Sequence, residues 1–109
     1  MGDTKLALDV KRALLRHTLA TLAYRGAKVV KNAPHDFAAF RTHETTRTPG
    51  EILAHVGDLL DWALRTAHGE YVFKISAPLP WEEEAARFFA ALKSLDSYLA
   101  SDSPLGFPA

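Results

Sequence analysis

Residues Thr48 to Ala63 read TPGEILAHVGDLLDWA, and this stretch decides the fold because it marks both the start of a helix and its buried face. Thr48 can cap the helix, Pro49 suits the first helical position, and Glu51 can fold back onto the cap N–H, a combination known as a capping box. Gly69 has the backbone freedom to end the helix. The expected apolar face follows helical spacing and consists of Ile52, Val56, Leu59, Leu60, Ala63 and Ala67.

Two further helices are predicted by the same periodicity, one on each side of this stretch. The first begins near Asp3 or Thr4, either of which can cap it. It ends before Pro34, because proline lacks an N–H and disfavours helix in the residue before it. The last begins at Trp81, where three acidic side chains at 82–84 face the positive end of the helix dipole, and ends within 101–104.

The rest of the chain is expected to be irregular. Residues 34–48 form a connection in which Phe37 and Phe40 are expected to pack against the bundle and residues 41–47 to be solvated. Residues 70–80 form a second connection with a short extended piece around Tyr71–Ile75. Residues 1–103 make a single helical domain, and residues 104–109 are expected to be a loose tail.

Three amphipathic helices predict an all-α fold, an antiparallel bundle of three long helices. Their apolar stripes are wide, with Leu53, Trp62 and Leu64 lying beyond a narrow seam. A stripe of this width suits a helix with two neighbours, so the sequence favours a four-helix packing. We therefore expect an exposed apolar face that drives association into a homo-oligomer, a dimer in the simplest case.

Composition excludes several classes of function. Lys plus Arg and Asp plus Glu number 13 each, so no basic excess points to a nucleic-acid partner. The apolar runs are too short to cross a membrane and the N-terminus lacks a signal-peptide layout, which leaves a cytoplasmic location as the default expectation. The absence of cysteine excludes disulfides and thiolate ligands, so a metal would need His, Asp or Glu.

His55 is the candidate site residue. It shares a helix face with Ile52, Leu59 and Trp62, which predicts that it points towards the bundle interior or its edge. Such a histidine is either a packed core residue or a metal ligand, and spacing alone favours the first. Its neighbours Glu51 and Asp58 could fix its tautomer as second-sphere carboxylates do, or form a solvated pair.

The other four histidines are weaker candidates. His17 could border the same interior, whereas His35, His43 and His68 are expected at the surface. No two histidines are three or four residues apart, so the sequence contains no two-point metal clamp on one helix.

A family resemblance becomes specific at Thr48–Ala63, which resembles the second-helix signature of DinB-like (DNA-damage-inducible) proteins. The stretch LPWEEEAARFF at 79–89 resembles the start of the third helix in that family. The first helix, with Leu15-Arg16-His17 and Leu22-Ala23-Tyr24-Arg25, is compatible with it. The similarity extends over nearly the whole chain to about Ser103.

The resemblance implies a dimeric four-helix bundle that binds zinc or nickel through three histidines, as in metal-dependent thiol transferases or hydrolases. His55 matches the ligand on the second helix. The other two ligands belong to a His-x-x-x-His pair on a fourth helix, which this sequence lacks. We therefore expect a DinB-like domain that is incomplete and inactive alone, with no metal stably bound by this chain.

Three explanations for this departure stay open. The chain is a truncated form, or copies associate to give a non-catalytic interaction domain through the exposed apolar face. In the third, a histidine of another copy, or His17 with a carboxylate, completes an unusual site.

Overall fold

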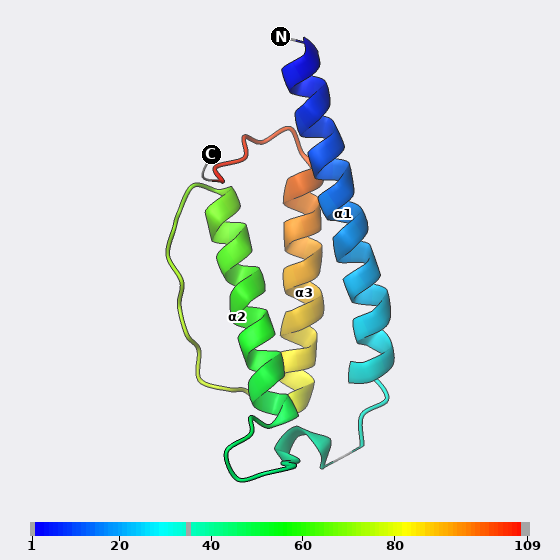
Figure 1. The fold of residues 1–109 in the computed structure, drawn as a ribbon, viewed down its shortest axis with the longest axis vertical. Coiled ribbons are helices and arrows are strands. Elements are labelled where there is room, and N and C mark those ends of the chain that lie inside the picture. Colours follow the sequence, from blue (N-terminus) through cyan, green and yellow to red (C-terminus); the bar gives the residue numbers. More distant parts are fainter. Residues whose placement is uncertain (1, 35, 108–109) are drawn as a thin grey trace.

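The computed structural model describes residues 2–34 and 36–107, and it is all-α over these ranges (Figure 1). Three long helices are present: α1 (Gly2–Val30), α2 (Pro49–Ala67) and α3 (Trp81–Ala100). A short 3-10 helix, η1 (Phe37–Ala39), lies in the connection between α1 and α2. The three predicted helices are therefore confirmed, and their ends lie within a few residues of the sequence signals.

Helix α3 is the centre of the fold because it packs along both α1 and α2 (Figure 1). Phe88 and Leu92 of α3 belong to the main core cluster, together with Val30 at the end of α1 and Leu53 and Leu60 of α2. Burying these side chains away from water is the main stabilising contribution to the bundle. The core thus forms on the two sides of α3.

The predicted antiparallel order holds for α1 and α3 but is wrong for α2 and α3. The Trp81 indole N–H, at the start of α3, donates to the carbonyl of Val30, at the end of α1 (3.4 Å). By contrast, the Tyr98 hydroxyl near the end of α3 donates to the carbonyl of Ala67 at the end of α2 (3.2 Å). Helices α2 and α3 are parallel because residues 68–80 run back along α2 before α3 begins (Figure 1).

Helix α2 has the N-terminal capping box and the C-terminal glycine that the sequence predicts. The Glu51 N–H donates to the Thr48 hydroxyl (3.1 Å) and the Thr48 N–H donates to the Glu51 carboxylate (3.1 Å), which completes the capping box. Gly69 follows the helix with φ +88°, a conformation that residues with a Cβ rarely adopt. Both signals come from local chemistry, which explains why they can be identified without tertiary information.

Helix α1 extends beyond the rest of the bundle at its N-terminal end (Figure 1). The Arg12 guanidinium donates to the carbonyls of Leu99 (3.2 Å) and Ser101 (2.9 Å), and thereby caps the C-terminal end of α3. Residues 5–11, which precede this contact, are all exposed. No helix in the described part of the chain is long and apolar enough to span a membrane.

The expected loose tail lies against the end of the bundle as far as it is described. The Gly106 N–H donates to the carbonyl of Ala67 (2.8 Å), the Tyr98 hydroxyl donates to the carbonyl of Pro104 (2.5 Å), and Tyr71 also donates to Gly106. These bonds tie residues 104–106 to the ends of α2 and α3.

The chain is more open than a compact domain of its size. Its radius of gyration is 16.1 Å, whereas about 13 Å is typical for this length. It exposes 7716 Å² of surface, whereas a compact monomer of 12.0 kDa exposes about 6,000 Å². The exposed apolar side chains of α1 and α2 contribute to this surface, together with residues 68–80, all of which are exposed.

Candidate functional site

His55 lies outside the core, at the edge of the bundle. Its ring meets Phe73 of the 68–80 connection edge-on, with ring centroids 6.3 Å apart. Ile52, Leu59 and Trp62 share its face as predicted, and all of them are exposed. This face of α2 therefore points away from α3, and the burial expected for an inward histidine is not found.

A shallow groove of about 300 Å³ lies beside His55, and its walls include Glu51, Asp58 and Ser76. Neither carboxylate bonds to His55 in the part of the chain that the structure describes. Glu51 accepts from Thr48 in the capping box and from Arg41 (3.1 Å). The hydrogen bonds from the Thr48 backbone and side chain hold the pKa of Glu51 below its usual range.

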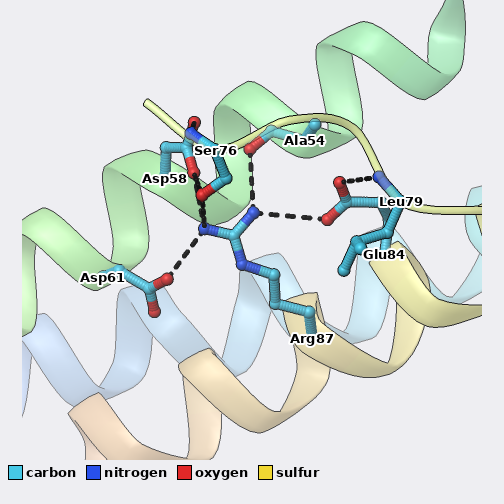
Figure 2. Close-up of polar contacts among 7 residues, drawn as sticks. All are labelled: Ala54, Asp58, Asp61, Ser76, Leu79, Glu84 and Arg87. Carbon is cyan, nitrogen blue, oxygen red and sulfur yellow. Dashed lines mark hydrogen bonds and ion pairs between the residues drawn. The ribbon is translucent and has the colours of Figure 1, made fainter. Parts of the chain in front are cut away.

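Asp58 takes part in a buried network centred on Arg87 of α3 (Figure 2). Nη2 of Arg87 lies 2.5 Å from Oδ1 of Asp58 and 2.8 Å from Oδ2 of Asp61, both on α2. Nη1 donates to Oε1 of Glu84 and to the carbonyl of Ala54, each at 3.3 Å. Asp58 is 3% exposed and Glu84 is 1% exposed, so these charges are largely removed from water.

The same network holds the 68–80 connection against the helices (Figure 2). Asp58 accepts from the Ser76 N–H (3.1 Å) and from the Ser76 hydroxyl (2.7 Å). Glu84 accepts from the Leu79 N–H (3.0 Å). The network therefore joins α2, α3 and the segment that connects them.

The electrostatics of the network favour its charged form. Burial pushes the pKa of Asp58 upward, but hydrogen bonds from Arg87 and Ser76 outweigh burial and hold this pKa below its usual range. Burial also opposes the charge on Arg87, yet the bonds to Asp58, Asp61 and Glu84 raise its pKa. A carboxylate and a guanidinium stabilised in this way are poor proton donors or acceptors near neutral pH, so the arrangement suits a structural role.

Gly57 makes room for the guanidinium. A Cβ placed on Gly57 would lie 2.9 Å from Nη1 and 3.0 Å from Cζ of Arg87. A side chain at position 57 would therefore displace the guanidinium from its present place in the network.

Helical periodicity predicts only part of this network. It places Asp58 beside His55 and Glu84 among three acids at the start of a helix, but it assigns no role to Arg87 or Ser76. The available signal was Asp58 and Asp61, three residues apart on α2 beside Gly57. Their partner depends on the register between α2 and α3, which helical periodicity does not specify.

The other histidines lie apart from His55. His17 borders an open groove between α1 and α3, next to the exposed ion pair of Arg16 and Asp96 (2.9 Å). His43 bonds with Thr45 in the first connection, and the exposed His68 ring packs on Tyr98 at 4.2 Å between centroids. The surface prediction is confirmed for His43 and His68, whereas His35 lies outside the described residues.

The described residues do not fit the metal centre that the family resemblance implies. Within 2–34 and 36–107, no three side chains of His, Asp or Glu are grouped so that they could hold a metal ion. Of the groups around His55, Glu51 is committed to the helix cap and Asp58 to Arg87. Among the residues of this groove that could bind a metal, His55 alone has no hydrogen-bonded partner in the described part of the chain.

A second, apolar groove of about 350 Å³ opens between α1 and α2. Leu22 and Val29 of α1 form one wall, Ile52 and Val56 of α2 form the other, and Phe88 of α3 belongs to the lining between them. It differs from the groove beside His55 in having no charged residue in its lining.

Comparison of the chain with protein-family models, with curated proteins and with solved structures finds no match, so the resemblance to DinB-like proteins stays a prediction.

Proposed function

We propose that this chain is a non-catalytic helical interaction domain that associates with itself through the apolar faces of α1 and α2. The observation that carries the proposal is the amount of exposed apolar side chain on these helices. On α1 the exposed set is Leu6, Leu8, Val10, Leu14, Leu15, Leu22 and Val29, and on α2 it is Ile52, Leu59 and Trp62. Soluble monomers rarely leave large areas of apolar side chain open to water, and such areas mark interaction sites.

The distribution of apolar residues on α1 supports the same conclusion. A helix with one packing partner has one apolar face and one polar face. Helix α1 packs on α3 through one face, yet it presents leucines and valines on other faces as well. Such a helix needs more than one neighbour, and α3 supplies only one of them.

The surplus surface is large enough for a stable interface. The chain exposes about 1,700 Å² more than a compact monomer of its mass. In a standard protein–protein interface each partner buries roughly 800 Å². Burial of about half of this excess surface by a partner would therefore match a standard interface.

The metal-dependent enzyme function implied by the family resemblance is the weaker candidate for this chain. It requires three ligands, and His55 stands without a second free ligand in its groove.

Light scattering of the full chain over a range of concentrations tests the proposal. We expect a molar mass at least twice 12.0 kDa. The variant Leu15→Glu places a charge on the exposed face of α1 and should lower the mass, whereas Ser94→Glu, at an exposed position of α3, should not. A monodisperse 12.0 kDa species at every concentration would overturn the proposal.

A further inference from the structure

The groove between α1 and α2 has the form of an empty corner in a bundle. Helix α3 packs along both α1 and α2, so these two helices stand on either side of it. The groove lies between them and includes Phe88 of α3 in its lining. This arrangement matches three corners of a square four-helix packing, in which the fourth helix contacts α1 and α2 together.

Helix α1 carries a regular seam on the side of this groove. Leu8, Leu15, Leu22 and Val29 are seven residues apart, and each is at least 40% exposed. Leu22 and Val29 line the groove directly. Residues seven apart lie nearly above one another on a helix, so these four side chains form one apolar stripe along α1.

A second exposed seam on α1 consists of Leu6, Val10 and Leu14. At 3.6 residues per turn it lies roughly 130° around the helix from the first seam. A helix seated in a groove between two others must be apolar on two sides, and α1 has these two sides in addition to the face that contacts α3.

We infer that the occupant of the groove is α1 of a second copy of this chain, and that the exchange is mutual. In a two-fold symmetric dimer the same patch serves both copies, so each α1 lies in the groove of the other. The first seam of α1 then packs against its counterpart, and the second seam packs against α2 of the other copy. This inference rests on the proposed function and specifies the surface through which self-association occurs.

The symmetry also sets the direction of the helices. Each α1 can lie between α1 and α2 of the other copy without overlap of α3 and α2 of different copies only if the two-fold axis runs along the bundle, so the two α1 helices are parallel. Leu8 of one copy then lies near Leu8 of the other, and the later residues of the first seam also face their own counterparts. Ala13 is exposed and lies roughly 170° around α1 from the first seam, so its two copies point away from each other.

Single-cysteine crosslinking tests this geometry directly, because the chain has no cysteine of its own. The variants Leu8→Cys and Ala13→Cys are treated with a short bifunctional maleimide, and each product is analysed by denaturing gel and by light scattering of the untreated variant. We expect Leu8→Cys to give crosslinked dimer as the main product. Ala13→Cys, on the opposite side of the same helix, should stay uncrosslinked.

The outcomes separate the inference from the proposed function. If the chain is dimeric but Leu8→Cys stays uncrosslinked, the two first seams do not face each other in parallel and the inference is wrong. If the chain is dimeric and Ala13→Cys crosslinks, the opposite side of α1 forms the contact and the inference is also wrong. In both cases self-association stands. If both variants and the unmodified chain are monomeric, the inference and the proposed function fail together.

Discussion

Arg87 of α3 and Asp58 of α2 form an ion pair with 2.5 Å between Nη2 and Oδ1, and both side chains are largely withdrawn from solvent. Asp58 also binds Ser76 through two hydrogen bonds, so the pair fixes the connection as well as the two helices. A parallel helix pair needs a connection that returns along its whole length. The Arg87–Asp58 pair anchors that return segment about midway along α2.

Removing Arg87 should therefore destabilise the fold strongly. Arg87→Met keeps the length and apolar stem of the side chain but leaves the buried Asp58 and Glu84 without their cation. Loss of one partner of a buried ion pair costs about 3–5 kcal/mol of the free energy of unfolding. Urea denaturation at a fixed chain concentration measures this change, because association contributes to apparent stability.

Arg16→Met is the matched control for Arg87→Met. Arg16 of α1 also forms an ion pair with an aspartate of another helix, Asp96 of α3. Both side chains of this pair are substantially exposed. Exposed ion pairs contribute little to stability. Equal losses in the two variants would contradict the structural role of the buried network.

The lowered pKa of Asp58 predicts acid sensitivity. Because its pKa in the folded chain lies below the ordinary value of 3.8, the unfolded chain takes up its proton first as the pH falls. The stabilisation is complete above pH 3.8 and is lost as the pH falls through the folded-state pKa. Denaturation at several pH values should show this loss in the unmodified chain and a flatter dependence below pH 3.8 in Asp58→Asn. An unchanged dependence in Asp58→Asn would assign the acid sensitivity to other carboxylates.

The sequence was sufficient for features that depend on neighbouring residues. The capping box at Thr48, the end of α2 at Gly69 and the apolar periodicity of α3 all act within one or two helical turns, and the structure confirms each of them. The direction of α3 relative to α2 was predicted wrongly. The connection at 68–80 can span about 40 Å when extended, which exceeds the length of α2, about 28 Å, so its length allows either direction.

The buried network could not be predicted for a related reason. Arg87 meets Asp58 only because α2 and α3 are parallel and in a particular register, and no pattern within either helix encodes that register. The position of His55 also depends on how α2 packs against α3, which the sequence pattern does not specify. Its spacing is equally compatible with a core position and with the exposed edge at which it lies, since the difference depends on which face of α2 meets α3.

The capping box gives a local prediction about stability. Thr48→Ala removes the hydroxyl that accepts from the Glu51 N–H and should lower the free energy of unfolding by about 1 kcal/mol. Thr48→Ser keeps the hydroxyl and should stay close to the unmodified chain. Chemical denaturation of the two variants in parallel measures the difference. A serine variant as unstable as the alanine variant would attribute the effect to packing of the threonine methyl group.

Metal binding distinguishes the interaction domain from an enzyme of the DinB-like class. Because Glu51 and Asp58 are already held by other groups, His55 alone should bind zinc or nickel too weakly to retain it. Equilibrium dialysis against each metal followed by elemental analysis should therefore give far less than one ion per chain, both in the unmodified protein and in His55→Ala. His17→Ala serves as the matched control, since His17 borders a different groove. Stoichiometric metal that is lost in His55→Ala and kept in His17→Ala would mean that association or rearrangement supplies the missing ligands, and the enzyme class would then be the better proposal for this chain.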